Sequence, residues 1–286
     1  MDKIIRLAVQ KSGRLSERSL EFIKECGISY SRNKTRLKST AYNFPLEILY
    51  LRDDDIPKYV AAGVADIGIV GENVLAEKGE DVEMTLRMGF SKCRLSLAIR
   101  QNEAYEGIQQ FDGQKIATSY PNLLQNYLQS QGVTAEIHEI SGSVEIAPSI
   151  GLADGVCDIV SSGSTLLANG LKEVEVIFKS EAVLVSNPEL SAEKREILDQ
   201  LLFRIHAVLR AESYKYVLMN VPNDSIEEVA SLIPGMKSPT VTPLAGSGWS
   251  SIHSVLQEDD FWQSIEKIKA AGAQGILVVP IEKMIL

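Results

Sequence analysis

Two short segments of the chain share one sequence pattern, and this internal similarity constrains the fold more than any other feature. Residues 63–75 read GVADIGIVGENVL and residues 155–167 read GVCDIVSSGSTLL. Both fit G-V-[AC]-D-I-x3-G-x3-L, a short apolar run followed by a glycine turn and a helix start. Ligands of open α/β sheets bind beyond the carboxyl ends of the strands, where such turns lie. The repetition favours two lobes around a shared cleft, and the alternative is a chance likeness of two small-residue turns.

The first two thirds of the chain alternate short β-branched runs with amphipathic stretches, which is typical of α/β proteins. Glycines and prolines at the ends of these runs mark the turns. We expect strands at residues 4–9, 46–51, 65–70, 95–100, 115–118, 135–139, 159–161 and 181–186. We expect helices at residues 16–26, 57–62, 72–78 and 192–212, the last with a continuous apolar stripe.

The pattern changes after residue 212. Strands are expected at residues 214–221, 240–244, 249–256 and 275–279, with helices at 225–232 and 260–270. This βαββαβ order is that of a ferredoxin-like module. We therefore predict three domains: lobe I from residues 1–93 and 184–211, lobe II from residues 94–183, and a C-terminal domain from residues 212–286.

Charge and reactive side chains exclude several classes of protein. Lys and Arg number 29 and Asp and Glu number 38, so a net charge of −9 argues against a nucleic-acid-binding protein. No apolar run reaches the roughly 20 residues of a membrane-spanning helix, and residues 1–6 do not resemble a secretion signal. The three cysteines and three histidines are scattered and predict neither disulfides nor a metal cluster. We expect a cytoplasmic protein that binds neither nucleic acid nor membrane.

The second copy of the shared pattern contains the stretch richest in potential chemistry. After the apolar Ile159 and Val160 come four hydroxylated residues around one glycine: Ser161, Ser162, Gly163, Ser164 and Thr165. Free backbone N–H groups at a helix start, a glycine that lets the main chain approach closely, and hydroxyl donors together suit a phosphate group. A simple helix cap is the alternative.

Cationic residues follow two of the expected strands of lobe I. Lys11 and Arg14 flank a turn at Gly13, and Arg52 precedes three aspartates. These positions suit contacts with phosphates, but solvated loop charges or an ion pair between Arg52 and a neighbouring aspartate explain them equally well. Tyr120 follows the strand at 115–118 and suits either stacking on a base or burial in a turn.

These pieces, taken together, resemble the ATP phosphoribosyltransferase family in its long form. The matching segments are collinear and span essentially the whole chain: AVQKSGRL (8–15), RDDDIPKYV (52–60), ADIGIVGENVL (65–75), CRLSLA (93–98), KIATSYPN (115–122), GSVEIAP (142–148), LADGVCDIVSSGSTLLANGLKEVEVI (152–177), SPTVTPLA (238–245) and GILVVPIEKMI (275–285). The family commonly has Thr in the 161–164 loop where this chain has serines, so the hydroxyl chemistry is kept.

The resemblance implies a fold and a reaction. The catalytic part would be α/β, two-lobed and like periplasmic binding proteins, followed by the ferredoxin-like regulatory domain. The enzyme would join ATP to 5-phosphoribosyl 1-pyrophosphate (PRPP) with Mg²⁺, giving N1-(5-phosphoribosyl)-ATP and pyrophosphate, the first step of histidine biosynthesis. No nucleophile or general base is implied, because positioning and charge neutralisation suffice, and Mg²⁺ would be held mainly by substrate phosphates.

The resemblance also assigns residues to ligands. PRPP would contact Asp154, Asp158, Glu145, Ser161, Ser162, Gly163, Ser164 and Thr165. ATP would contact Lys11, Gly13, Arg14, Arg52, Asp66 and Tyr120. Histidine, as feedback inhibitor, would contact Asn220, Met236, Thr240 and Gly275.

Assembly and the competing functions complete the expectations. Long-form members act as homohexamers, with a dimeric form also found in the family, and need no separate regulatory subunit. A non-catalytic cytosolic sensor of small molecules on the same two-lobed fold is the main alternative function, and another nucleotide-using transferase is a weaker one.

Overall fold

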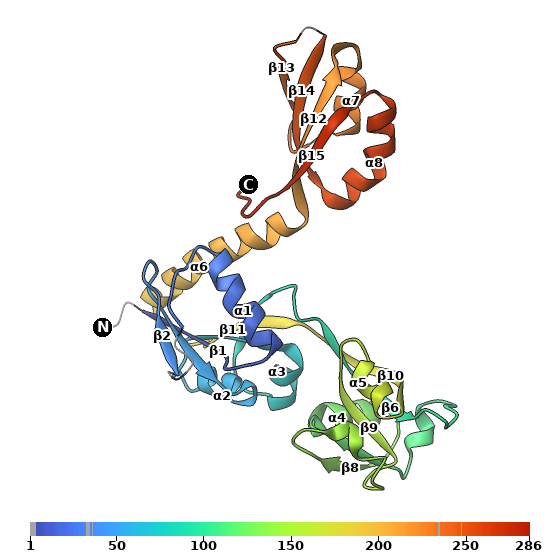
Figure 1. Ribbon diagram of the computed structural model, residues 1–286. Helices are drawn as coiled ribbons and strands as arrows, with labels where there is room; N and C mark the ends of the chain where they lie inside the picture. The colour runs from blue at the N-terminus through green and yellow to red at the C-terminus, as the bar shows by residue number, and fades with distance from the viewer. Residues whose placement is uncertain (1–3, 33–34, 36, 234, 247) are drawn as a thin grey trace. The chain divides into compact units, whose positions relative to one another are not determined.

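The structure, a computed structural model, describes residues 4–32, 35, 37–233, 235–246 and 248–286. It divides into two compact units, Met1–Lys24 with Ile28–Leu198, and Glu25–Gly27 with Asp199–Leu286. The first unit holds two separate sheets, and the second holds one (Figure 1). Within the described residues, no helix is long and apolar enough to cross a bilayer.

The N-terminal lobe is a six-stranded sheet in the order β2-β3-β1-β4-β11-β5. Its central strands β1, β3 and β4 are parallel, whereas β11 runs antiparallel to both β4 and β5. Burial on both faces explains why β1 and β4 read as apolar runs in the sequence. The elements are β1 (Ile5–Gln10), α1 (Arg14–Glu25), β2 (Lys38–Thr40), β3 (Leu46–Leu51), η1 (Asp53–Asp55), α2 (Ile56–Ala61), β4 (Ile67–Gly71), α3 (Glu72–Lys78), β5 (Glu83–Arg87) and β11 (Ala182–Ser186).

The second lobe is a five-stranded sheet in the order β10-β6-β9-β7-β8. β7 is parallel to β8 and β9, while β6 is antiparallel to both of its neighbours. The elements are β6 (Cys93–Arg100), η2 (Ile108–Phe111), β7 (Lys115–Thr118), α4 (Pro121–Ser130), β8 (Glu136–Glu139), η3 (Val144–Ile146), β9 (Gly155–Val160), α5 (Ser164–Ala168) and β10 (Leu171–Ser180).

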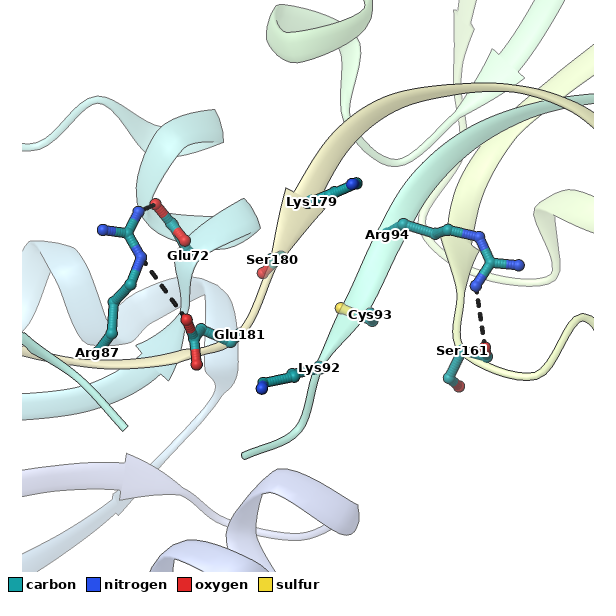
Figure 2. Close-up of a pocket in the computed structure, with 9 residues that line it drawn as sticks. All are labelled: Glu72, Arg87, Lys92, Cys93, Arg94, Ser161, Lys179, Ser180 and Glu181. Atoms are coloured by element: carbon teal, nitrogen blue, oxygen red, sulfur yellow. Dashed lines mark hydrogen bonds and ion pairs between the residues drawn. The ribbon is translucent and has the colours of Figure 1, made fainter. Parts of the chain in front are cut away.

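The chain passes between these two sheets twice. Residues 88–92 join β5 to β6, and Glu181 alone separates β10 from β11. Ser180 lies opposite Cys93 in the β10–β6 pair, so both passages leave the second sheet at one point (Figure 2). The N-terminal sheet is therefore completed by a strand from much later in the sequence, as the two-lobed prediction requires.

Two strands of the second lobe differ from the sequence-based expectation. β10 was not predicted, because its alternating charged and apolar residues show no continuous apolar run, yet it is the longest strand of this sheet. The strand expected at 159–161 in fact spans Gly155–Val160, since pairing with β6 and β7 overrides the weak strand preference of glycine and aspartate. Asp158 consequently lies within β9.

The C-terminal unit confirms the ferredoxin-like prediction. Its four-stranded antiparallel sheet has the order β13-β14-β12-β15, and two helices pack on one face around residues such as Val217 and Ile252 (Figure 1). The elements are β12 (Tyr214–Pro222), η4 (Asn223–Ser225), α7 (Ile226–Leu232), β13 (Thr240–Pro243), β14 (Trp249–Gln257), α8 (Glu258–Ala270) and β15 (Gln274–Pro280). The long helix α6 (Ala192–Glu212) has the bounds that its apolar stripe predicted.

Candidate active site

The carboxyl edge of the N-terminal sheet gathers the predicted cationic residues. β1 and β3 are parallel neighbours whose register pairs Gln10 with Leu51, so Lys11 and Arg52 follow at the same edge. The Lys11 N–H donates to the Leu51 carbonyl at 2.7 Å, which holds the two strand ends together. Arg14 begins α1 a few residues later. Cationic side chains from two distant segments thus share one edge with the aspartates of η1.

The carboxyl end of β9 in the second lobe leads into the predicted phosphate loop. Residues 161–163 connect β9 to α5, and Gly163 adopts φ +80°, a conformation that favours glycine. The Ser162 and Ser164 hydroxyl oxygens are 3.0 Å apart. Within the part of the chain that the structure describes, the N–H groups of Ser162 and Gly163 have no acceptor. The loop therefore offers hydroxyl and backbone donors to an anion.

One cavity of about 570 Å³ brings the two edges together. Of the predicted site residues, Arg14, Tyr120, Asp158 and Ser161 line it. The remaining lining residues are Gln10, Leu15, Arg18, Asp53, Gly71, Asn73, Ser91, Lys92, Cys93, Ser119, Ile159 and Ala182. Its walls thus combine cations with carboxylates, hydroxyls and one aromatic ring.

Two carboxylates flank Tyr120 in this cavity. Burial raises the pKa of Asp53 to about 6, and the neighbouring Asp54 adds to the shift. Burial also raises the pKa of Asp158, and the nearby Glu145 adds to that shift. The pKa of the Tyr120 phenol is raised by burial, then by Asp53 and, more weakly, by Asp158. The phenol therefore stays protonated and can donate a hydrogen bond.

A buried amide fixes the direction of that hydrogen bond. Asn73 Nδ2 donates to Tyr120 Oη at 2.9 Å, so the phenol oxygen acts as acceptor there and its own proton is left for another acceptor. Asn73 is itself held by Ser180, whose hydroxyl donates to Asn73 Oδ1 at 2.8 Å. Sequence reasoning missed both Asn73 and Ser180, which are 107 residues apart, because only their contact reveals a role.

Glu77 ties the start of α4 to α3 beside Tyr120. Its two carboxylate oxygens accept the N–H groups of Asn122 and Leu123 at 3.0 and 2.9 Å. The first backbone N–H groups of a helix have no acceptor within the helix, and a carboxylate there accepts their hydrogen bonds. The positive end of the helix dipole also stabilises its negative charge. Glu77 is only 6% exposed, and it too was not identified from the sequence.

Two predicted residues lie away from the cavity. Asp154 precedes β9 at the end opposite to the phosphate loop, where its carboxylate accepts the Lys115 N–H at 2.9 Å. Asp66, 4% exposed, pairs with Lys194 at 2.7 Å and accepts the Arg6 N–H at 2.8 Å. Both carboxylates form contacts that hold strands and helices together, and neither is among the residues that line this cavity.

The other predicted residues are not among those that line the cavity. Lys11, Gly13 and Arg52 lie near Gln10, Arg14 and Asp53 in the sequence, and Glu145 interacts electrostatically with Asp158. The rest follow Ser161 in the chain: Ser162, Gly163, Ser164 and Thr165. Gly13 has φ +102°, which explains the glycine in the turn between Lys11 and Arg14.

A second cavity of about 420 Å³ lies where the chain passes between the sheets (Figure 2). It shares Lys92, Cys93 and Ser161 with the first cavity. On one side Arg87 pairs with Glu72 and Glu181, as the dashed lines in Figure 2 show. On the other side Arg94 donates to the Ser161 carbonyl at the start of the phosphate loop.

Comparison with known proteins decides between the functions that such a cavity can serve. The family model described as HisG, ATP phosphoribosyltransferase, matches residues 52–207, and the HisG C-terminal domain matches residues 211–283. The ATP phosphoribosyltransferase of Cytophaga hutchinsonii is 61% identical over 285 residues, covering 100% of both chains. That of Bacteroides fragilis is 58% identical over 283 residues, covering 99% of this chain and 100% of the relative. The chain belongs to the ATP phosphoribosyltransferase family. It is therefore an enzyme, a pentosyltransferase of histidine biosynthesis.

Solved structures agree with this family and with the two-lobed fold. The ATP phosphoribosyl transferase (HisG:HisZ) complex from Thermotoga maritima matches with a TM-score of 0.60 and 31% identity, covering 71% of this chain and 99% of that one. The substrate-binding protein of an amino acid ABC transporter matches with a TM-score of 0.50 at 11% identity, covering 73% and 94% of the two chains. The latter likeness shows the fold alone, and it confirms the expected likeness to periplasmic binding proteins.

The four residues predicted to bind histidine lie at different places among the described residues of the C-terminal unit. Asn220 and Gly275 are neighbours, since a Cβ on Gly275 would lie 3.4 Å from Asn220 Nδ2. Thr240 lies on β13, separated from β12 by β14. Met236 lines a cavity of about 390 Å³ beside α8, where none of the other three residues contributes.

Proposed function

We propose that this chain transfers the 5-phosphoribosyl group of PRPP to N1 of ATP, releasing pyrophosphate. The observation that carries the proposal is the cavity itself, which unites cations of one lobe with a hydroxyl-rich, glycine-containing loop of the other. Family membership supports the same reaction. A sensor on the same fold would bind these ligands without converting them, so turnover separates the two hypotheses.

The proposed roles follow from the chemistry of each wall. The hydroxyls and N–H groups of residues 161–165 hold the 5-phosphate, and Asp158 with Glu145 accepts hydrogen bonds from the ribose hydroxyls. Lys11, Arg14 and Arg52 neutralise the phosphates of the nucleotide. Tyr120 packs against the purine and donates its phenol proton.

The reaction needs no protein nucleophile. Adenine N1 attacks ribose C1, the N1–C1 bond forms, and the bond from C1 to the pyrophosphate oxygen breaks. The adenine ring is left positively charged and loses a proton from its exocyclic amine. Fixed orientation of two bound reactants can lower a barrier by about 7–11 kcal/mol, which suits a site built from placed donors and cations.

Magnesium fits this site as a companion of the substrates. Among the described residues, no three or more His, Cys, Asp or Glu side chains form a metal-binding group. Asp158 and Glu145 are close enough to influence each other and would supply at most two carboxylate ligands. Mg²⁺ commonly keeps waters and binds substrate phosphates beside one or two carboxylates. When bound, it would neutralise charge developing on the pyrophosphate.

Regulation and assembly belong to the proposal as well. We assign histidine feedback inhibition to the C-terminal unit through Asn220, Met236, Thr240 and Gly275, in a homohexamer, or its dimeric form, without a separate regulatory subunit. The matching C-terminal family domain supports this assignment. A cytoplasmic location is supported by three free cysteines, as expected in a reducing compartment. Added histidine should slow the full-length enzyme, and Thr240→Val should weaken that inhibition without changing the uninhibited rate.

The direct test is to mix the full chain with ATP, PRPP and Mg²⁺ and follow adduct formation by absorbance and mass spectrometry. We expect an adduct that added pyrophosphate reverses, and none when ribose 5-phosphate replaces PRPP. Gly163→Val should abolish PRPP binding in calorimetry. Gly170→Val is the matched control, because Gly170 also has a positive φ, +69°, at the other end of α5. Absence of adduct at high enzyme concentration would contradict the proposed function.

A further inference from the structure

Arg94 occupies a position from which it contacts both neighbours of its strand. β6 lies between β10 and β9, and Arg94 stands opposite Val160, the last residue of β9. Its guanidinium forms a two-pronged ion pair with Glu173 of β10. It also donates through Nη1 to the Ser161 carbonyl at 3.2 Å, the contact drawn in Figure 2. One side chain therefore links β10 to the start of the phosphate loop.

The carboxylate that holds Arg94 is itself fixed. Ser96 Oγ donates to Glu173 Oε1 at 2.7 Å, and Ser96 shares the Arg94 face of β6. The Arg94 hydrogen bonds lower the pKa of Glu173, so this carboxylate is ionised throughout the neutral range. The Arg94 and Glu173 side chains are only 33% and 24% exposed. The guanidinium is thus held in one orientation by two planar hydrogen bonds, which a lysine cannot reproduce.

This contact controls the direction of a loop donor. The peptide between Ser161 and Ser162 is planar and trans, so its N–H points opposite to its carbonyl. With the Ser161 carbonyl held by Arg94, the Ser162 N–H is directed away from Arg94. Ser162 and Ser164 are exposed, Gly163 is half-buried, and among the described residues the hydrogen bonds of this segment are mainly those of its own hydroxyls. Arg94 therefore anchors the one end of the loop that the helix does not fix.

We propose that Arg94, oriented by Glu173 and Ser96, is a positioning residue for phosphate recognition. It presets the peptide that presents the Ser162 N–H, and it acts through the loop rather than by touching the ligand. The inference rests on the proposed function, since it deepens the role of residues 161–165 as the site of the sugar phosphate. The proposal gives the Arg94–Glu173 ion pair a role, although neither residue takes part in the reaction itself.

The first test compares Arg94→Met with Arg87→Met in the full-length enzyme. Both substitutions remove an arginine that pairs with glutamate at the second cavity, but only Arg94 contacts the loop (Figure 2). We expect the Arg94 variant to raise KM for PRPP about tenfold, the order of one charge-assisted hydrogen bond, while KM for ATP stays within about twofold. An unchanged KM for PRPP, or an equal rise in the Arg87 variant, would overturn the proposal.

Two further variants separate positioning from plain structural support. Glu173→Gln leaves the arginine in place but releases its orientation, so KM for PRPP should rise by a smaller factor of about three. The double variant Arg94→Met/Glu173→Gln should be no worse than Arg94→Met alone, because both act through one contact. Arg94→Lys should be more stable than Arg94→Met, but its KM for PRPP should stay raised. Full recovery of KM by lysine, or additive losses in the double variant, would contradict the assigned role.

Hydrogen exchange tests the same inference without turnover. In the parent, PRPP without ATP should slow the exchange of the amides of residues 162–164, which have no strong acceptor in the unliganded loop. In Arg94→Met this protection by PRPP should be lost, while amides of the β6–β9 ladder stay protected in both proteins. Equal protection of the loop by PRPP in the two proteins would overturn the positioning role even if activity fell. If the parent enzyme formed no adduct, the proposed function would fail while this measurement still decided the role of Arg94.

Discussion

The segments β4–α3 and β9–α5 share one sequence pattern but differ in local structure. In both, a strand ends at the main cavity and a glycine precedes a helix, and the paired residues Val74 and Leu166 are both buried. In the first copy the strand runs directly into α3, whereas in the second three residues separate β9 from α5. That short loop is what makes the second copy a candidate phosphate site.

The shared aspartate shows the difference most clearly. Asp66 precedes β4 and is held by Lys194 and the Arg6 N–H, away from the cavity. Its counterpart Asp158 lies within β9, lines the cavity and has a pKa raised by burial. The shared sequence pattern therefore does not give its aspartate the same structural environment in both copies. Asp66, one residue before its strand, supports the fold, whereas Asp158, within its strand, faces the cavity.

The largest expected effect follows from replacing the cavity aspartate. Asp158→Asn should lower kcat/KM by about 100-fold or more, as loss of one placed polar group in an active site commonly does. Because burial raises the folded-state pKa of Asp158, its carboxylate opposes folding increasingly as pH rises through that pKa, so the variant should be equally or more stable at neutral pH. Steady-state kinetics and urea denaturation check both parts.

Replacing the counterpart should give the reverse outcome. Asp66→Asn removes the charge partner of Lys194, which is 24% exposed and so partly solvated, and should cost about 1–3 kcal/mol of stability. The kcat/KM should stay within about threefold of the parent. Asp66→Asn/Lys194→Gln is the control, and it should recover part of the loss in urea denaturation. A large fall in activity with unchanged stability would show that Asp66 serves the substrates after all.

The smallest expected effect concerns the shared glycine. Gly71 has an ordinary φ of −69°, but a Cβ there would lie 2.4 Å from Asn73 Oδ1, so Gly71→Ala should displace Asn73 and release Tyr120. We expect KM for ATP to rise about threefold and stability to fall by about 1 kcal/mol. Adding Asn73→Ala should change nothing more if Asn73 is the group displaced. Additive effects in the double variant would place the cause elsewhere.

The spacing of apolar residues predicted the bounds of elements that are buried or strongly amphipathic. The bounds of β3, β7, α3 and α6 match the prediction because apolar residues at strand or helix spacing report burial directly. The half-exposed strand β10 escaped prediction, and the start of β9 was misplaced by four residues, since sheet neighbours rather than local preference stabilise both. Asp154 was expected near the sugar on the family resemblance alone, and its hydrogen bond to the Lys115 N–H could not be foreseen from the sequence.

The sequence by itself determined the α/β class, the two lobes, the ferredoxin-like module and the loop of residues 161–165, because each depends on spacing within a short segment. Tertiary structure alone decided which side chains meet. The pairing of Asn73 with Ser180, of Glu77 with the start of α4, and of Arg94 with Ser161 joins residues 45 to 107 positions apart. Such contacts depend on strand order and register, and a single sequence does not encode these in any local pattern.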